Sequence, residues 1–493
     1  MEVRVHNSIV ISQKQIHAKV TKIALTVFDR LASDMHIGVV YSFKPPMATN
    51  AALIDGLTRT LVHFPTLAGH LGEDEDGRPS VILGDHTEGG VLVVEAMAAS
   101  NLEDHLPLTP SRNLKNLYPP LEDAVHLLQV QINRFACGGL ILGITAHHRI
   151  ADGQSMSYFF TTWGKSVRGL QLDQLPVYDH DWLLHREPPI CKFRHWIDEF
   201  VPLAELPTVL PKAPPEPRNL DNVLVHYSVK FISELKGRAP VNAKFSRFDV
   251  LMGHLWKKIT VARGLYPEDV TQVRIAINGR PRLSAPIVPT KYFGNLVLNA
   301  FPRAKVRYLE EFTVNESAQL VKDSVRQIGE AYFQSFIDFG AINKGKELVP
   351  VSDLERGVLS PNLEVDSWLG FDFHKMDFGG GGLCAFLPSW VPVEGVVIFM
   401  PSLHEDDKGG IDVVVTLLEE HAKVFRLISH SLGVLDCVSA CYSSLLQEPC
   451  SLRLRKRRAA RINFDRFDKE LKLLAYQILA NDDAHYQRST LKE

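Results

Sequence analysis

The sequence predicts an α/β protein built from two domains, each with a mixed β-sheet. Its 493 residues exceed the usual size of a single domain. Both halves alternate between the hydrophobic periods of strands and of helices. Six prolines lie between Pro202 and Pro217, and proline fixes φ and removes an N–H donor, so this stretch is neither a helix nor a central strand. We therefore expect domains over 1–184 and 218–432, joined by an extended crossover over 185–217.

The first half contains two predicted helices and two predicted strands. Leucine and isoleucine recur at helical spacing over 53–61, and aromatic residues do so over 156–167. Apolar residues alternate with Gln and Asn over 128–133, which is the period of a half-buried strand. A Gly-Gly turn follows, and the apolar run over 140–145 suits a buried strand. These elements predict a sheet with helices packed on it.

The second half repeats the mixture. Residues 273–277 alternate and end at Asn278-Gly279, a turn pair, while 396–400 and 411–417 predict two strands joined by a loop over 406–410. The remaining segment, 433–493, has a basic run over 453–458 and then apolar residues at helical spacing over 464–478. We interpret it as a basic loop and one surface helix, with a targeting or interaction tail as the alternative.

The composition excludes several classes of protein. Hydrophobic residues make up 45% and charged residues 23%, which is typical of a globular protein and not of a disordered or fibrous one. A net charge of −3 favours neither nucleic acid nor an anionic membrane as a partner. The six cysteines show no CxxC spacing, so we expect no disulfide scaffold and no structural zinc. We find no secretory signal and no apolar run of membrane-spanning length, and we expect a cytoplasmic protein.

The segment from His148 to Gly153 carries the strongest chemical signal. A predicted buried strand leads into it and an amphipathic helix follows, so His148 lies on a short loop held by rigid elements, where active-site groups often lie. Imidazole titrates near neutrality, and His148 is a candidate general base. Asp152 is a candidate partner of an arginine that holds the loop. The alternative is a capping histidine followed by a helix N-cap aspartate.

These residues resemble a known family. The His148–Gly153 segment resembles the HxxxDG motif of the plant BAHD acyltransferases, and Asp377-Phe378-Gly379 begins a segment similar to their DFGWG motif. Gly380 stands where that family usually has Trp. Three further stretches, 64–69, 278–282 and 292–295, agree with the family pattern. The resemblance runs from about residue 1 to residue 432.

The resemblance implies two similar-sized mixed-sheet domains of the CoA-dependent acyltransferase type, with a channel between them. It implies acyl-CoA as a co-substrate, no bound cofactor and no metal, and we expect a monomer. By similarity, His148 deprotonates the acceptor, and Asp152 turns away to pair with Arg280 or Arg282. Asp377, Phe378 and Gly379 have a structural role by the same resemblance. We expect Gly380 to leave that loop looser without abolishing catalysis.

Glu364 and Asp366 are candidate acceptor-binding residues. Residues two apart on a strand face the same way, and two carboxylates this close repel each other unless a cation lies between them. The surrounding 364–368 segment is similar to monocot agmatine and tryptamine hydroxycinnamoyltransferases, which indicates an amine acceptor of the agmatine, putrescine or tryptamine type. A solvated strand face is the alternative for the acidic pair. Trp368 is a candidate channel wall, or else a core residue.

Three functions therefore remain open from the sequence. The first is an N-acyltransferase that forms a phenolamide from a hydroxycinnamoyl-CoA and an amine. The second is an O-acyltransferase of the same family that acts on an alcohol, which the acidic pair disfavours. The third is a non-catalytic relative, which the presence of both His148 and Asp152 disfavours.

Overall fold

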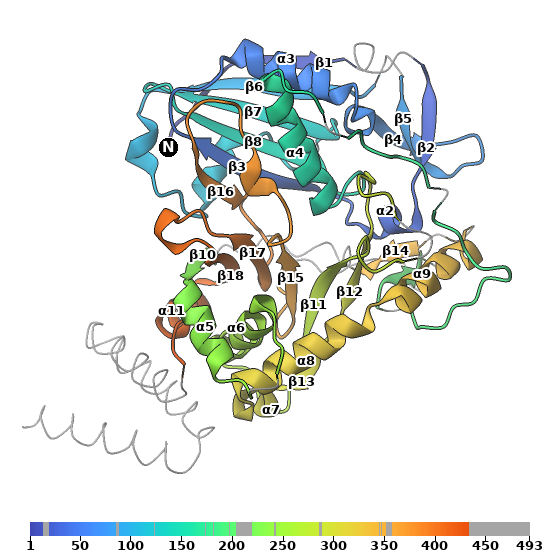
Figure 1. Ribbon diagram of the computed structural model, residues 1–493, viewed down its shortest axis with the longest axis vertical. Helices are drawn as coiled ribbons and strands as arrows, with labels where there is room; N and C mark the ends of the chain where they lie inside the picture. Colours follow the sequence, from blue (N-terminus) through green and yellow to red (C-terminus); the bar gives the residue numbers. More distant parts are fainter. Residues whose placement is uncertain are drawn as a thin grey trace, which may run out of the picture.

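The computed structural model describes residues 1–432 apart from internal gaps, which are 13–18, 85–87, 123, 173, 181, 197, 204–218, 241–242, 285–287, 345, 347 and 352–356. The predicted tail over 433–493 and the stretch 204–217 of the predicted crossover lie outside the described residues. The described chain forms two large mixed β-sheets, each with helices packed on it (Figure 1). The α/β fold class with two mixed-sheet units is confirmed. Among the described residues, no helix combines the length and the apolar character needed to cross a bilayer.

The first sheet has six strands. Their order is β1 (Arg4–Ile11), β6 (Val91–Ala98), β7 (Leu128–Phe135), β8 (Leu140–His147), β3 (His36–Phe43) and β16 (Leu383–Pro388). The pair β6–β7 is parallel and the other pairs are antiparallel. The main helices of this half are α2 (Val27–Leu31), α3 (Asn50–Leu61) and α4 (Gly153–Val167), and a small sheet of β2 (Thr21–Ala24), β5 (Pro79–Leu83) and β4 (His70–Glu73) lies beside them.

The edge strand β16 comes from the far end of the chain. It pairs with β3 in antiparallel fashion, and Phe386 lies opposite Tyr41. Residues 383–388 belong to the range that the sequence predicted to form the second domain, yet they complete the first sheet. The predicted domain limits placed all of 218–432 in one unit. They remain a prediction, and the structure adds that one strand of this range, β16, belongs to the first sheet.

The second sheet has seven strands. Their order is β10 (Leu220–Tyr227), β18 (Ile411–Leu418), β17 (Val396–Pro401), β15 (Leu363–Ser367), β11 (Val270–Asn278) and β12 (Val297–Ala300), and β13 (Arg303–Lys305) also pairs with β11. Its helices are α5 (Val229–Gly237), α6 (Arg247–Arg263), α7 (Val306–Glu311), α8 (Val314–Gln327), α9 (Glu330–Ile342) and α11 (Glu419–Ile428). A two-stranded ribbon of β9 (Phe200–Pro202) and β14 (Leu348–Pro350) lies apart from it.

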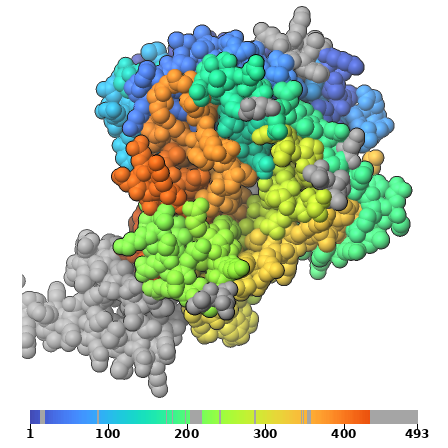
Figure 2. Space-filling model, viewed as in Figure 1, coloured from blue at the N-terminus to red at the C-terminus, as the bar shows by residue number. Residues whose placement is uncertain are grey.

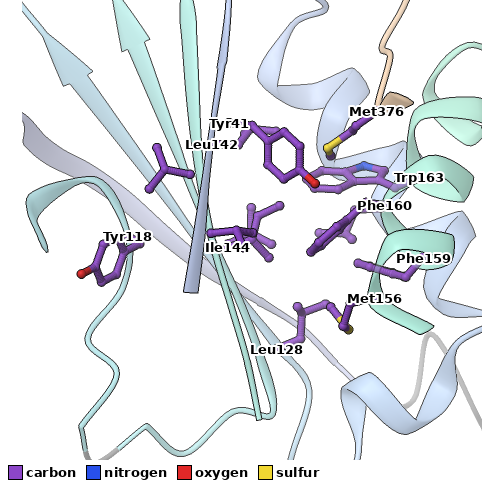
Figure 3. Close-up of a cluster of buried hydrophobic side chains, with 14 of the residues drawn as sticks. Tyr41, Tyr118, Leu128, Leu142, Ile144, Met156, Phe159, Phe160, Trp163 and Met376 are labelled. Carbon is purple, nitrogen blue, oxygen red and sulfur yellow. The ribbon is translucent and has the colours of Figure 1, made fainter. Parts of the chain in front are cut away.

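The core of the first half lies between α4 and one face of its sheet. Figure 3 shows Phe159, Phe160 and Trp163 of α4 in one cluster of buried side chains with Ile144 of β8. The three aromatic side chains are at most 2% exposed, and burying large apolar side chains stabilises a fold by about 1.5–3 kcal/mol each. The aromatic spacing that predicted this helix therefore reflects its packing. Both ends of α4 are consequently fixed in space.

The predicted half-buried strand β7 is buried on both faces. Gln129, Gln131 and Asn133, which were expected to face solvent, are at most 5% exposed. A 3-10 helix over Arg112–Leu117 and the loop after it cover this face, and carbonyls of that segment accept hydrogen bonds from all three amides at 2.8–3.0 Å. The prediction that one face of this strand is exposed to solvent was wrong. Residues 112–120, which have no hydrophobic period that would reveal their position, pack over that face.

The two halves meet along the second sheet. In Figure 2 residues of the C-terminal part of the described chain, coloured orange, lie against the blue and teal first half and above the green residues of the second half. Leu363 and Val365 of β15 belong to the second core, while Ile398 of β17 and Val414 of β18 pack with the core of the first half. One face of the sheet therefore carries its own helices, and the other face meets the first half. The channel expected between the halves stays a prediction.

Candidate active site

His148 is the first residue after β8, in the turn that leads into α4. Its backbone N–H donates to the Met35 carbonyl at 2.9 Å, and its own carbonyl accepts a hydrogen bond from the side-chain amide of Asn295 at 3.0 Å. The imidazole Nδ1 is buried and has no hydrogen-bond partner among the described residues. The protein therefore fixes His148 through its backbone, from both halves of the chain, and no carboxylate is committed to this ring nitrogen.

Asp152 is the N-cap of α4 and the partner of Arg280. One carboxylate oxygen accepts the Ser155 N–H at 3.0 Å, which is ordinary N-cap geometry. The other oxygen accepts from the Arg280 guanidinium at 2.6 Å and from the Leu296 N–H at 3.0 Å. The two side chains are 2% and 6% exposed. The capping interpretation and the arginine-pairing interpretation are thus both true of one carboxylate.

The structure chooses between the two predicted arginines. Arg280 reaches Asp152, and its Nη2 also donates to the Ser155 hydroxyl at 2.9 Å and to the Gly294 carbonyl at 3.1 Å. The backbone N–H of Arg282 donates to the Gly279 carbonyl at 2.8 Å in the turn after β11. Arg280 therefore ties the start of α4 to the second half of the chain, and Arg282 belongs to the turn that presents it.

Asp29 is a site residue that the sequence did not reveal. Its Oδ1 accepts both the backbone N–H and the side-chain amide of Asn295, at 2.9 and 3.1 Å. Its Oδ2 accepts the N–H and the hydroxyl of Thr26, at 2.9 and 2.7 Å, in the capping box of α2. Burial raises the pKa of Asp29, and these hydrogen bonds oppose the rise. Asp29 thereby orients the amide that holds the His148 carbonyl. A Thr-x-x-Asp pattern would have predicted the helix start only.

Glu364 and Asp366 lie on β15 and face the first half, since the alternate residues Leu363 and Val365 are buried in the second core. Glu364 accepts from the Arg274 guanidinium of the neighbouring strand at 2.5 Å. The two carboxylates are therefore not equivalent to each other, because Glu364 already has a cationic partner. The sequence predicted that both carboxylates share one cation of the ligand. In the structure Arg274, which the sequence analysis did not single out, already neutralises Glu364.

Asp366 is the carboxyl group in electrostatic contact with His148. Burial and the negative charge of Glu364 raise the pKa of Asp366 to about 6, while positive charge on His148 and Arg274 lowers it. A buried carboxyl with a raised pKa beside a candidate base is a pattern found at functional sites. The structure thus brings Asp366 and His148 together from opposite halves of the chain.

Trp368 lies in the first core. It is 9% exposed, and its ring lies 5.3 Å from that of Phe373 and 5.5 Å from that of Phe386. Of the two interpretations left open for this residue, the described contacts are those of a core residue. Its role in acceptor binding stays a prediction.

The DFG segment lies at the other end of α4. Asp377 makes an ion pair with Arg168 at 2.5 Å, and Phe378 packs edge-on against Trp163. A side chain at Gly164 would meet the Asp377 carbonyl at 2.5 Å, so the segment rests directly on the helix backbone. Gly164 is twelve residues from Asp152, which at 1.5 Å per residue is about 18 Å. The segment is therefore remote from His148, in keeping with a structural role.

Gly380 does not leave its loop loosely packed. A Cβ atom there would lie 2.2 Å from the Pro46 carbonyl oxygen, and the Gly381 N–H donates to that same oxygen at 2.6 Å. Gly379 has φ of +78°, a conformation that favours glycine. The expectation of a looser loop is wrong, because the absence of a side chain lets the segment dock against residues 44–47.

The arrangement can support proton transfer beside two carboxyl groups. His148 has the chemistry of a general base, its backbone is clamped from both halves, and Asp366 with Glu364 supplies negative charge on the facing sheet. Asp152 and Arg280 make the frame and do not reach toward the ring. The group of His and carboxylate side chains found close enough together to hold a metal ion, within the part of the chain that the structure describes, does not include these residues.

Comparison with known proteins agrees with this geometry. The model of the Transferase family matches residues 1–429. The chain is 41% identical to tryptamine hydroxycinnamoyltransferase 2 of Oryza sativa subsp. japonica, over 83% of this chain and 93% of that protein. It is 39% identical to agmatine coumaroyltransferase-1 of Hordeum vulgare, again over 83% and 93%.

Similarity also extends to solved structures. The crystal structure of vinorine synthase superposes with a TM-score of 0.64 over 85% of this chain and 96% of that one, at 19% identity, which supports the fold. The family match covers both sheets and every residue of the clamped His148 site. The chain therefore belongs to the BAHD acyltransferases of the Transferase family.

Proposed function

We propose that this protein is an acyl-CoA-dependent N-acyltransferase that moves a hydroxycinnamoyl group from its CoA thioester to an amine. The observation that carries the proposal is the placement of Asp366 and Glu364 on β15, facing the histidine of the transferase motif. The names of the two relatives, which refer to tryptamine and agmatine, support an amine acceptor. We further propose that the enzyme acts in the cytoplasm as a monomer.

In this mechanism His148 accepts a proton from the acceptor amine. The amine nitrogen attacks the thioester carbonyl and forms the C–N bond of the amide, and the C–S bond then breaks. The CoA thiolate leaves and takes the proton back from His148, so no acyl-enzyme is formed. A general base of this kind contributes about 10²–10⁴-fold to the rate. Asp152 and Arg280 position the loop that carries the base.

The two carboxylates have different parts in acceptor binding. Among the ion pairs of the described residues, Arg274 pairs with Glu364, whereas Asp366 lies in the field of His148. Asp366 is therefore the better anchor for the remote cationic group of agmatine or putrescine. Glu364, with Arg274 at 2.5 Å, sets the local charge and raises the pKa of Asp366. Charge-assisted hydrogen bonds to a guanidinium are among the stronger polar contacts.

A direct comparison of acceptors tests the proposal. The purified enzyme is given p-coumaroyl-CoA with agmatine, putrescine, tryptamine or shikimate, and the released thiol is measured. We expect amines to be acylated at a kcat/KM at least tenfold above that of shikimate. Shikimate as the best acceptor would replace the amine proposal with an O-acyltransferase. Lack of turnover with every acceptor would favour the non-catalytic relative.

Loss of the Asp366 charge should impair binding of a cationic acceptor. Asp366→Asn is expected to raise the KM for agmatine by more than tenfold with little change in kcat, because removal of one partner of a desolvated charge pair costs about 2–5 kcal/mol. The KM for acyl-CoA should hardly move. The indole end of tryptamine is neutral, so tryptamine kinetics should change much less. Steady-state kinetics with both acceptors measures this.

Glu364→Gln is the matched comparison on the same strand. We expect a smaller rise in KM, because Glu364 is already engaged by Arg274. Glu311→Gln on α7, an exposed position, serves as a control for the loss of one carboxylate. Agmatine kinetics that are unaltered in both β15 variants would remove the acidic pair from acceptor recognition.

The raised pKa of Asp366 predicts a pH dependence. Because this pKa is about 6, the carboxylate is charged above pH 6 and becomes neutral as the pH falls below it. The ratio of agmatine kcat/KM between wild type and Asp366→Asn should therefore be constant above about pH 7 and approach 1 well below pH 6. Taking the ratio cancels the ionisation of the amine, which is the same for both proteins. In Glu364→Gln the fall should move to lower pH, and a ratio that does not vary with pH would contradict the assignment.

A further inference from the structure

A second cluster of ligand-type side chains lies at one end of the second sheet, away from His148. His226 is on β10, Asp412 is opposite it on β18, and His404 lies in the hairpin between β17 and β18. The His226 Nδ1 is 2.7 Å from the Asp412 Oδ1, and the two imidazole rings have centroids 4.4 Å apart. Ligand atoms of all three residues lie within 4.8 Å of one another.

The outer ring nitrogen of His226 is held by a different carboxylate. Its Nε2 is 3.0 Å from the Asp407 Oδ2, and the Asp407 carboxylate also accepts the Val229 N–H, at 3.1 and 3.2 Å. A carboxylate that receives one ring N–H fixes the tautomer and directs the other nitrogen toward a metal. Asp407 is placed as such an outer carboxylate, and the other ring nitrogen of His226, Nδ1, points to Asp412 at 2.7 Å.

His404 supplies the adjustable ligand. Its side chain is exposed, and no hydrogen bond or ion pair of its ring occurs within the described chain. Its backbone is tethered, because its N–H donates to the Ser402 hydroxyl at 3.3 Å. Ligand atoms around a tetrahedral zinc ion, at about 2.0–2.2 Å from the metal, lie about 3.3 Å apart. Rotation of the exposed His404 side chain can therefore close the cluster without movement of the sheet.

We propose that His226, His404 and Asp412 form a binding site for a transition-metal ion of the Zn²⁺ type, with Asp407 as the outer carboxylate and water as a fourth ligand. Two imidazoles and one carboxylate are donors that suit zinc. The cluster lies at the β17–β18 hairpin and includes neither His148 nor Asp366. Its expected effect is structural.

Metal binding would affect a cavity that the β17–β18 hairpin borders. Its volume is about 380 Å³, and His404, Lys408 and Gly409 of the hairpin line it together with Arg247 of α6. A metal that joins His404 to β10 and β18 would hold one wall of this cavity in place. Metal occupancy is thus expected to stabilise the hairpin against proteolysis.

Metal titration of the full chain tests the proposal. Protein stripped with a chelator is titrated with Zn²⁺ in competition with a chromophoric chelator, and with Co²⁺ while the visible absorption is recorded. We expect one equivalent to bind, with the intense d–d bands of a four-coordinate site. His404→Ala should weaken zinc binding at least tenfold, and because His404 is exposed this variant should fold normally. Asp407→Asn should weaken it by about 10–100-fold, as for outer-shell carboxylates.

His185→Ala is the matched control, because His185 is an exposed histidine far from the cluster in sequence and makes its ring contact with the Arg186 carbonyl only. Its zinc affinity should equal that of the wild type. Equal zinc affinity of wild type and His404→Ala, or the absence of Co²⁺ d–d absorption, would overturn the site.

Discussion

His148→Ala should lower kcat by about 10²–10⁴-fold in a protein that still folds, because a positioned general base contributes that much to the rate. Both hydrogen bonds that fix residue 148 come from its backbone, and alanine keeps them. The Nδ1 of the removed ring has no partner among the described residues, so no buried group there loses a hydrogen bond. The variant therefore separates chemistry from folding.

Release of thiol from p-coumaroyl-CoA with a saturating amine measures the loss, and thermal unfolding by circular dichroism measures the fold. Added imidazole should restore part of the turnover, since a free base can enter the space left by the side chain. His63→Ala, outside the site, is the control for loss of a histidine. Near-normal turnover of a folded His148→Ala protein would remove this residue from the mechanism.

Asp152→Asn should destabilise the protein by about 3–5 kcal/mol and lower activity with it, because it leaves the buried Arg280 guanidinium without its counter-charge. The side chains of the pair are 2% and 6% exposed, so water does not compensate. An asparagine can still cap α4 through its oxygen, but its NH₂ group would then face the Leu296 N–H and the Arg280 guanidinium, which are both donors. The midpoint of urea unfolding measures the effect.

Asp377→Asn is the matched control for this variant. The Asp377–Arg168 pair also involves an end of α4, because Arg168 is its C-cap. Its side chains are 54% and 39% exposed, and exposed ion pairs contribute about 0–1 kcal/mol to the free energy of unfolding. We expect its unfolding midpoint to lie close to that of the wild type. An Asp152→Asn protein as stable as Asp377→Asn but inactive would assign Asp152 to the chemistry and not to the frame.

Local features of the site could be predicted from the sequence because they depend on neighbouring residues. The turn that carries His148 is bounded by β8 and α4, and both elements follow from hydrophobic period. The choice of Arg280 over Arg282 could not be predicted, because it depends on the direction in which the turn after β11 presents each side chain. Asp29 was missed for a similar reason. Its partner Asn295 is 266 residues away, and periodicity carries no information about such contacts.

The acidic pair shows the same division. Alternation on β15 predicted that Glu364 and Asp366 share a face, and the structure confirms it. That Arg274 is the neighbour of Glu364 follows from the parallel register of β11 and β15, which no local pattern specifies. The burial of Gln131 and Asn133 likewise depends on a non-repetitive segment that folds over β7. Strand register and the covering of a sheet face by a distant segment are long-range properties, and they decide which polar residues lie at the candidate site and which are buried in the structure.

The pairing of β16 with β3 has a consequence for how substrates enter. The chain leaves the second sheet after β15, completes the first sheet as β16, and returns as β17. A hinge that swung the halves apart would have to bend both connections of this strand, 368–382 and 389–395, and break the Asp152–Arg280 pair. We therefore expect entry and exit to rely mainly on side-chain and loop motions. For the same reason, two fragments divided at the proline-rich stretch would not be autonomous: the N-terminal fragment would end its sheet at β3 with an open edge that invites self-association.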